Sequence, residues 1–437
     1  MGPRGMGPRG SRHPRRSTRR PDRWIVSRPM DGVRVVEMAR VLAGPTVAQL
    51  MAEYGAEVIK VEPAPSGDPA RGLPYLRDGR SGYFIQANRG KRSVCLDFRS
   101  DEGKALLVDL ARHSDVLVES FRPGVLADMG LGWDVLHEAN PRLVLCSVTG
   151  LGYGGPLSHK PGYDTIGAAM SGVAHVSGPV GGPPMLPGPA MGDAATGVYG
   201  FGGVAAALFQ RERTGLGDWV QLSLLDTYMA FHEINIQAYS GSGGTQVPEA
   251  SGNYHATVCP AGFFRCRDRY LFVACVSPGD WLRVAAAIGR PELAHAPGFA
   301  ANDERAARRE EVNRLLEDWL ATFDDPEDAI GVLTEHRVTC ELIRTLPEAI
   351  AHPHNVARRV IREVPDEVWG SVTVPGLPIR FAGMTERELR ARELGADNRS
   401  VLREVLELDD ARIDELEKAH VVQGPPTLTP TPIEEPS

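Results

Sequence analysis

The chain has little cysteine for its length, and its cysteines form no recognisable pairs. There are six in 437 residues, and none stands in a C-x-x-C spacing. Scattered cysteines in a chain of this size are typical of reduced, buried thiols, so we expect a cytoplasmic protein without disulfides. Cys259 and Cys266 lack a second His/Cys pair at zinc spacing, so no metal site is predicted.

Long apolar runs and the common nucleotide and hydrolase motifs are also absent. No stretch approaches the roughly 20 apolar residues that cross a bilayer, which argues against an integral membrane protein. No G-x-G-x-x-G follows the first predicted strand, and there is no P-loop, G-x-S-x-G or H-E-x-x-H motif. The standard NAD, ATP, serine-hydrolase and zincin interpretations therefore have no support.

Acidic residues outnumber basic ones in the body of the chain, and the start of the chain is strongly basic. The net charge is −8, yet residues 1–30 hold nine Arg and one Asp, which leaves −16 for the rest. An acidic body argues against nucleic acid as a partner. Residues 1–30 carry almost no apolar side chains and are expected to form a disordered basic extension. The Pro/Thr-rich residues 421–437 are expected to form a disordered tail.

What the chain does carry is an alternation of strand and helix patterns. Strands are predicted at 33–38, 57–62, 93–98, 116–119 and 143–148, with helices at 46–54, 102–113 and 135–139. This alternation predicts an α/β fold with a parallel, doubly wound sheet. Such sheets bind ligands at the carboxyl ends of their strands. The loops after these strands are therefore candidate site loops.

The later part of the chain suggests a second, smaller unit. A helix is predicted at 193–210, a strand at 219–224 and a helix at 227–238, followed by a Gly/Ser-rich loop. A hairpin turning at Arg267-Asp268 and helices at 280–288, 302–323 and 326–336 then indicate an α+β unit. A strand pair within 370–381 and an amphipathic stretch at 400–416 come last. We divide the chain into a large domain (31–240), a small domain (241–345) and a linker that returns to the large domain (346–420).

The segment Pro189–Gly197 places one carboxylate, Asp193, among small residues at a predicted helix start. Asp is a preferred N-cap, so a purely structural role is open. A chemical role is open as well. A helix N-terminus is expected to keep a carboxylate ionised and to offer N–H groups to an oxyanion, and Gly192 and Ala194 are expected to leave room for substrates.

An ordered series of short motifs resembles the family III (CaiB/BaiF-type) CoA-transferases over about residues 31–420. The motifs are VLAGP at Val41–Pro45, YGAEVIKVEP at Tyr54–Pro63, GDPAR at Gly67–Arg71, NRGKRS at Asn88–Ser93, ESFRPG at Glu119–Gly124, PGYD at Pro161–Asp164, MGD at Met191–Asp193, GN at Gly252–Asn253, HPH at His352–His354 and GLP at Gly376–Pro378.

The resemblance implies a Rossmann-like large domain that binds CoA, a small domain that closes over it, and an interlocked homodimer. It implies that CoA moves from an acyl-CoA donor to a carboxylic acid, with CoA as substrate and no permanently bound cofactor. Asp193 matches the family's nucleophile, which forms an acyl–aspartyl anhydride and then an aspartyl-CoA thioester.

Further site residues follow from the same resemblance. Tyr163 and Asp164 are expected to support the active site. His255 is open between a site residue that faces the acceptor and an ordinary loop histidine. The residues expected to bind CoA are Arg40, Val41, Leu42, Ala43, Pro63, Lys91, Leu96, Arg99, Ser120, Phe121 and Arg122.

The chain departs from the formate/oxalate members of the family at three positions. Leu42 replaces a glutamine, Ser120 an asparagine and Asp128 an arginine that is often near a CoA phosphate, which argues against formate or oxalate as substrates.

Two other functions stay open. A 2-methylacyl-CoA racemase needs two opposed acid/base groups, and Tyr163 stands where related racemases have His. A CoA-binding protein without catalysis is the other.

Overall fold

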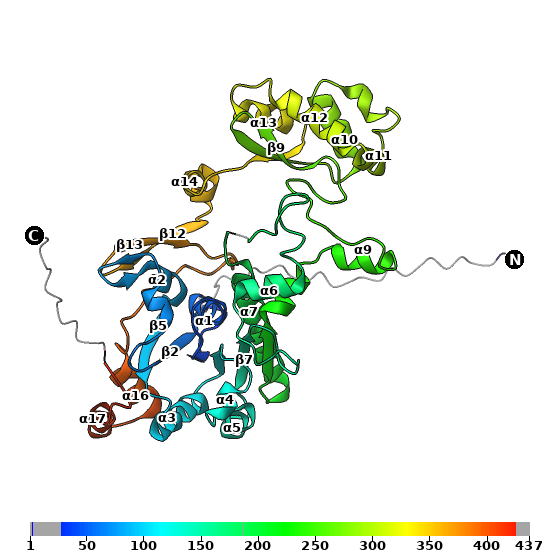
Figure 1. Ribbon diagram of the computed structural model, residues 1–437. Helices are drawn as coiled ribbons and strands as arrows, with labels where there is room; N and C mark the ends of the chain where they lie inside the picture. Colours follow the sequence, from blue (N-terminus) through cyan, green and yellow to red (C-terminus); the bar gives the residue numbers. More distant parts are fainter. Residues whose placement is uncertain (1, 3–27, 187, 425–437) are drawn as a thin grey trace, which may run out of the picture.

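The computed structural model describes residue 2, residues 28–186 and residues 188–424. Most of the expected basic extension and of the expected tail lies outside these residues. Figure 1 shows a large assembly of helices around a central sheet, and a smaller group of elements joined to it by two connecting segments.

The central sheet has six parallel strands in the order β5-β2-β1-β6-β7-β8. The strands are β1 (Arg34–Glu37), β2 (Glu57–Pro63), β5 (Lys91–Leu96), β6 (Val116–Glu119), β7 (Val144–Thr149) and β8 (Trp219–Ser223). The chain therefore starts in the middle at β1, moves outward to β5 and crosses back to β6. The predicted α/β fold with a parallel sheet is confirmed, and β1 and β6 flank its topological switch point.

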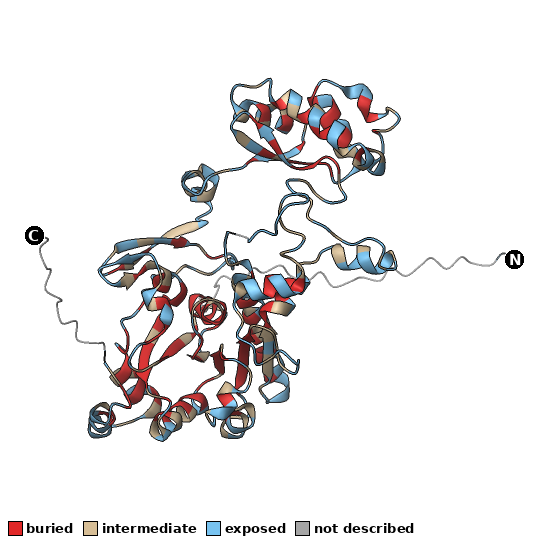
Figure 2. Ribbon diagram, in the orientation of Figure 1, coloured by how far each residue is buried: buried red, intermediate tan, exposed pale blue. Residues whose placement is uncertain are grey.

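Alternate side chains of these strands are buried on opposite faces of the sheet, so each face needs a cover of helices. Helices α1 (Ala43–Glu53) and α7 (Met191–Thr214) pack on one face. Helices on the other face are α3 (Asp101–Arg112), α5 (Trp133–Ala139), α16 (Asn398–Leu406) and α17 (Asp410–Lys418). Figure 2 shows the resulting buried centre in red.

Close contact between α1 and α7 depends on a glycine. A Cβ built on Gly197 would lie 2.5 Å from Cβ of Thr46 on α1, which no relaxed packing allows. The Gly/Ala-rich sequence of α7 thus lets it lie directly on α1. This contact fixes where the first turn of α7, which carries Asp193, sits relative to the loop after β1.

The last described residues stay attached to the sheet rather than forming a free tail. Leu96 of β5 pairs in an antiparallel bridge with Val422, and both Val421 and Val422 are buried. The tail expected from residue 421 therefore does not begin before Gly424, because two apolar side chains at 421 and 422 complete the core under α16 and α17.

The smaller group is built on an antiparallel sheet, β9 (Ala261–Cys266), β10 (Arg269–Ala274) and β11 (Thr339–Leu342). The hairpin turns at Arg267-Asp268 as predicted. Its helices are α10 (Pro278–Ala287), α11 (Asn302–Ala307), α12 (Arg309–Leu320) and α13 (Pro326–Glu335). The single helix expected over 302–323 is divided at Arg308. These elements share their own apolar core.

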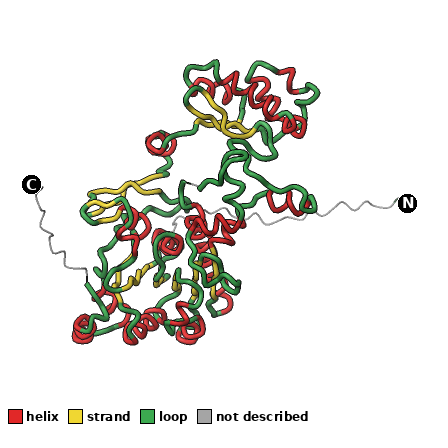
Figure 3. Tube along the Cα trace, viewed as in Figure 1, coloured by secondary structure: helices red, strands yellow, loops and turns green. Residues whose placement is uncertain are grey.

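Figure 3 shows how helices, strands and loops are distributed over the molecule, and several connecting elements differ from the sequence prediction. The helix expected at 227–238 is two helices, α8 (Leu224–Ala230) and α9 (Asn235–Gly241). The strand pair expected within 370–381 lies earlier, as β12 (Ile361–Asp366) and β13 (Gly370–Pro375). The remaining α-helices and strands are α2 (Gly82–Asn88), the short hairpin β3 (Leu76–Arg77) and β4 (Arg80–Ser81), α4 (Val125–Asp128), α6 (Asp164–Ser171), α14 (Leu346–Ala351) and α15 (Pro353–Ala357).

Candidate active site

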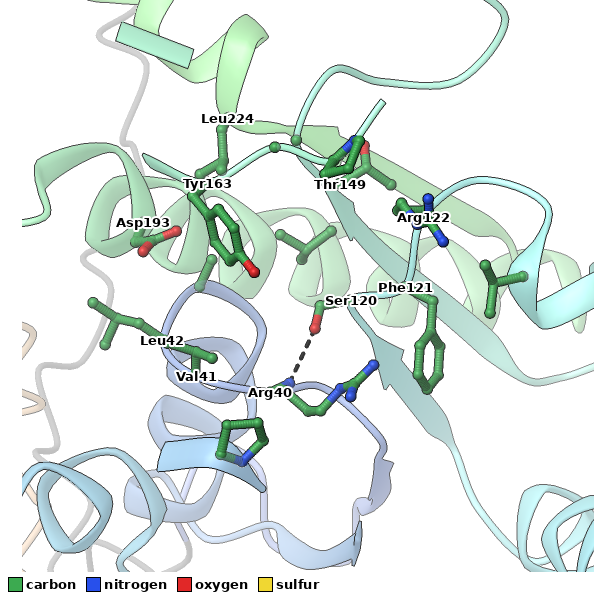
Figure 4. Close-up of a pocket in the computed structure, with 17 residues that line it drawn as sticks. Arg40, Val41, Leu42, Ser120, Phe121, Arg122, Thr149, Tyr163, Asp193 and Leu224 are labelled. Carbon is green, nitrogen blue, oxygen red and sulfur yellow. Dashed lines mark hydrogen bonds between the residues drawn. The ribbon is translucent and has the colours of Figure 1, made fainter. Parts of the chain in front are cut away.

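A cavity of about 380 Å³ lies at the carboxyl ends of β1, β6 and β7, at the switch point of the sheet. Nine of the predicted site residues line it together: Arg40, Val41, Leu42, Ala43, Ser120, Phe121, Arg122, Tyr163 and Asp193. Figure 4 shows Asp193 and Tyr163 on one side of the view and Arg40 and Arg122 on the other. The location is the one that an open parallel sheet offers to a nucleotide-like ligand.

The loop after β1 is held in a strained conformation. Val41 has φ +69°, a region that β-branched residues rarely occupy. Two hydrogen bonds fasten this turn. The Arg40 N–H donates to Oγ of Ser120 at 3.0 Å, and the Val41 N–H donates to Oδ1 of Asp68 at 3.2 Å. The loop therefore presents Leu42 and Ala43 to the cavity in a preset position.

A buried group of charges lies directly beneath this loop. Nζ of Lys60 lies 3.0 Å from Glu37 and 2.9 Å from Asp68, and it donates to the Ala39 carbonyl at 2.9 Å. Burial alone would raise the pKa of Asp68, but the Lys60 charge and the N–H donors outweigh it and lower that pKa. Asp68 is thus held as a carboxylate that anchors Val41.

Lys91 belongs to this buried group and not to the cavity, contrary to its expected role in CoA binding. Its Nζ lies 2.6 Å from Glu37 and donates to the Pro45 carbonyl and to Oδ1 of Asn88. Burial lowers the pKa of Lys91 to about 8. An ammonium group enclosed in this way has no exposed face for a phosphate.

The other expected CoA residues divide into two groups. Arg40 and Arg122 are exposed at the cavity, with the Arg40 guanidinium 5.2 Å from the centre of the Phe121 ring. Leu96 is buried in the core, so its side chain is closed to a ligand, which corrects that expectation. Pro63, the last residue of β2, and the exposed Arg99, on the loop after β5, lie outside the cavity lining.

Asp193 is the third residue of α7 and does not cap it. The helix begins at Met191, and Ala190 occupies the N-cap position. The pKa of Asp193 is also not depressed, as a helix N-terminus alone would make it. Burial, and then the negative charge of Asp164, raise this pKa to about 6. The half-buried carboxylate still lines the cavity.

Asp164, and not Asp193, binds a free backbone N–H at the start of α7. Its Oδ1 accepts from the Asp193 N–H at 2.8 Å, and its Oδ2 accepts from the Tyr228 hydroxyl at 2.9 Å. The Gly192 N–H points to the same hydroxyl at 3.3 Å. Because the Met191 and Ala194 N–H groups bond to backbone carbonyls, the first turn of α7 offers no free N–H to an oxyanion, contrary to expectation.

The room beside Gly192 is occupied by protein. A Cβ at this position would lie 2.2 Å from the Tyr228 ring and 2.6 Å from Oδ1 of Asp164. Gly192 therefore admits Tyr228 and Asp164, and not the substrates that the sequence analysis expected there. Tyr228 was missed from the sequence because an aromatic residue on an apolar helix carries no chemical signature.

Tyr163 and His255 differ in their placement. Tyr163 lines the cavity and is 74% exposed, so its side chain is available to a ligand. His255 lies in the segment before β9, and its Nδ1 accepts from the N–H groups of Thr257 and Val258. In the described chain His255 does not line the cavity; it organises the loop that leads into the small sheet.

Glu119 is a second buried carboxylate near the cavity that sequence reasoning did not select. It ends β6 and accepts from the Phe121 N–H at 2.6 Å. Burial raises the pKa of Glu119 to about 7. Its contact with Phe121 shapes the loop from Ser120 to Arg122. The sequence signal that could have identified Glu119 is a carboxylate at the end of an apolar strand.

Among residues 28–186 and 188–424, no cluster of three or more His, Cys, Asp or Glu side chains is arranged for a metal ion. Over the same residues, no helix is long and apolar enough to cross a membrane.

The chain matches known proteins over nearly its whole described length. The model of CoA-transferase family III matches residues 30–398. The mouse succinyl-CoA:glutarate CoA-transferase is 32% identical over 408 residues, covering 91% of each chain. The Chloroflexus aurantiacus succinyl-CoA–D-citramalate CoA-transferase is 34% identical over 401 residues, covering 90% of this chain and 98% of that one.

Solved structures agree. A CaiB/BaiF family protein from Brucella suis superimposes with a TM-score of 0.75 at 33% identity, over 87% of this chain and 100% of that one. The cavity at the switch point agrees with these sequence and structure matches. This chain belongs to CoA-transferase family III and is an enzyme that transfers CoA between acyl groups.

Proposed function

We propose that the enzyme moves CoA from succinyl-CoA to a dicarboxylic acid, with Asp193 as the covalent nucleophile. The observation that carries the mechanism is the position of Asp193: a half-buried carboxylate on the wall of the cavity at the switch point, with its pKa raised to about 6. A carboxylate with a raised pKa is a stronger nucleophile than a solvated one and is still ionised at neutral pH.

The proposed reaction has four balanced steps. An Asp193 oxygen attacks the thioester carbonyl of the donor, and the carbon–sulfur bond breaks to give a mixed anhydride and CoA thiolate. The thiolate attacks Cγ of Asp193, which releases the donor acid as its carboxylate and leaves an aspartyl-CoA thioester. The acceptor carboxylate attacks Cγ and again releases the thiolate. The thiolate then attacks the acceptor carbonyl and frees Asp193. No proton is gained or lost.

The two sides of the cavity support different roles. The guanidinium groups of Arg40 and Arg122 are exposed and suit the anionic groups of CoA. The preset turn at Val41–Ala43 leads from them toward Asp193, so we assign it to the pantetheine arm. Arg99 on the neighbouring loop stays a candidate for a CoA phosphate, and Pro63 a candidate contact for the adenine.

The choice of substrates is supported by the relatives and by Leu42. Two similar enzymes are named for succinyl-CoA and for the dicarboxylic acids glutarate and citramalate. Leu42 lines the cavity with an apolar side chain where the formate/oxalate type has glutamine. An apolar wall favours a donor and an acceptor that carry methylene groups.

We also propose that a second copy of the chain covers α6 to α9, as an interlocked homodimer. Exposed apolar side chains gather on these helices: Ile166, Met170, Val198, Tyr199, Phe209, Met229, Ile236 and Tyr239. No residue of α9 is buried within the chain, and this helix projects away from the sheet in Figure 1. So much apolar surface is characteristic of an obligate interface. Within the dimer, residues 241–345 act as the small domain that closes over CoA.

Mass spectrometry of the Asp193 peptide tests the mechanism. The enzyme is incubated with succinyl-CoA alone, and the same is done with Asp193→Ala. We expect a CoA-sized adduct on Asp193, removable by hydroxylamine, and loss of transfer by at least about 10³-fold in the variant. Glutarate, citramalate, oxalate and formate are then compared as acceptors.

Full transfer by Asp193→Ala would overturn covalent catalysis. A preference for oxalate or formate, which contain no methylene group, would overturn the assignment of an acceptor dicarboxylic acid that carries methylene groups. The racemase alternative predicts deuterium exchange at the α-carbon of a 2-methylacyl-CoA without any acceptor. The geometry does not favour it, because Asp164 is engaged at both oxygens and Tyr163 replaces a histidine.

A further inference from the structure

We propose that Tyr228 is a positioning residue for the transfer reaction, acting through Asp164 and Gly192 to hold the nucleophile Asp193 in place. This inference rests on the proposed role of Asp193. Tyr228 lies on α8, and its side chain is almost completely buried. It therefore does not touch the substrate itself, and any effect it has on the reaction must pass through its neighbours.

The hydroxyl of Tyr228 closes a ring of contacts around the first turn of α7. It donates to Oδ2 of Asp164 and accepts from the Gly192 N–H, while Oδ1 of Asp164 accepts from the N–H of Asp193. The Tyr228 hydroxyl thus connects Gly192, which precedes the nucleophile, with the Asp164 carboxylate. That carboxylate in turn binds the backbone N–H of Asp193. The hydroxyl oxygen of Tyr228 makes both contacts, one to Gly192 and one to Asp164.

The fit between α8 and α7 shows that this contact is built into the packing. The ring of Tyr228 fills the space that Gly192 leaves open, since any Cβ there would lie 2.2 Å from it. One residue earlier, Oγ1 of Thr227 accepts from Oγ1 of Thr196 at 2.8 Å, both side chains being buried. Two consecutive residues of α8 therefore fasten the first two turns of α7.

Two consequences follow for the nucleophile. The backbone of Asp193 cannot tilt without breaking the bond to Asp164, so the carboxylate is kept at the angle from which it attacks. Asp164, whose negative charge acts on Asp193, is also kept with both oxygens engaged and turned toward the backbone. A misplacement of about 1 Å at a reacting group can cost on the order of 100-fold in rate.

The test replaces only the hydroxyl, by Tyr228→Phe. We expect kcat to fall by about 10- to 100-fold with KM for succinyl-CoA changed less than about threefold, because the CoA contacts lie elsewhere in the cavity. Formation of the Asp193 adduct in a single turnover should slow by the same factor. The acceptor is the one that gives the highest wild-type rate in the panel above.

A matched control is Tyr54→Phe. Tyr54 is also buried, and its hydroxyl donates to the Ile379 carbonyl at 2.9 Å, remote from the cavity lining. Each variant loses one buried hydroxyl, which makes two hydrogen bonds at Tyr228 and one at Tyr54, so both should lower Tm. Only Tyr228→Phe should lower kcat.

A double-mutant cycle with Asp164→Asn separates positioning from packing. If Tyr228 acts through Asp164, the rate losses of Tyr228→Phe and Asp164→Asn are strongly non-additive, and the double variant resembles Asp164→Asn alone. Additive losses, or a wild-type kcat in Tyr228→Phe, would overturn the proposal. Incorporation of fluorinated tyrosine, which keeps the hydroxyl and alters its donor strength, supplies the measurement if Tyr228→Phe does not fold.

The outcome for Asp193→Ala keeps the two proposals apart. If that variant is inactive and the wild-type adduct forms, an unaffected Tyr228→Phe rejects only the role of Tyr228. If Asp193→Ala retains transfer, covalent catalysis fails, whatever Tyr228 does.

Discussion

The carboxylate of Asp193 shows how burial and position decide the chemistry of a single residue. A helix N-terminus favours its ionised form, but partial burial and the nearby charge of Asp164 act in the opposite direction and raise its pKa to about 6. The residue is thus largely ionised at neutral pH yet poorly solvated, which suits a nucleophile.

The raised pKa predicts an acid limit to activity. In the proposed mechanism only the carboxylate form of Asp193 attacks the thioester, so kcat/KM should reach half its maximum near pH 6 and fall about tenfold for each further pH unit below it. Rates with succinyl-CoA between about pH 4.5 and 8 check this.

Asp164→Asn provides the matched comparison, because its amide oxygen still accepts from the Asp193 N–H while the negative charge is removed. Its acid limb should move to lower pH, since one of the two causes of the raised pKa is gone. If the acid limb of the pH–rate profile stays at the same pH in this variant, a group other than Asp193 controls the loss of activity.

At the scale of elements, long-range contacts set the boundaries that local patterns left open. Asp164 begins α6, yet it caps α7 at a position 29 residues away. Likewise β5, predicted from its apolar run, depends on residues more than 300 positions later. Oδ1 of Asn398 accepts from the Cys95 N–H, and its Nδ2 donates to the Gln423 carbonyl.

Asn398→Ala should therefore destabilise the large domain. Asn398 is buried, and its loss leaves one backbone donor and one acceptor without partners, which costs about 1–3 kcal/mol. A fall of a few degrees in Tm is expected. The control on the same helix is Glu404→Ala, which removes an ion pair between the exposed Glu404 and the partly exposed Arg92 and should cost under about 1 kcal/mol. Equal Tm values for the two variants would contradict this account of β5.

For the whole molecule, the large exposed apolar area on α6 to α9 is consistent with the proposed second copy of the chain, and interlocking of the two copies has a consequence of its own. Two chains that pass through each other cannot separate without unfolding. A dimer of the 47.3-kDa chain should therefore keep its mass on dilution.

Subunit exchange tests this directly. Two differently tagged preparations are mixed and analysed by native mass spectrometry. No mixed dimer should form over days under native conditions, and mixed dimers should form after denaturation and refolding. Spontaneous exchange within hours would show an ordinary side-by-side dimer, and a monomer would reject the second copy altogether.

Much of the site could be predicted from the sequence because its loops follow directly from the strands. The residues after β1 and β6 gather at the cavity, since parallel strands bring their carboxyl ends to one edge. Lys91 and Leu96 were misplaced for the same reason that Tyr228 was missed. Local pattern does not tell whether a side chain faces a ligand, an opposite charge or the core.

Sequence patterns were enough to predict the α/β architecture, the family and Asp193 as the proposed nucleophile, because periodicity and short motifs are local properties of the chain. How Asp193 is held depends on the tertiary structure. The cap on α7, the raised pKa of Asp193 and the need for glycine at 192 all come from Asp164 and Tyr228. These residues meet Asp193 only when three separate helices pack together, so no local pattern could reveal them.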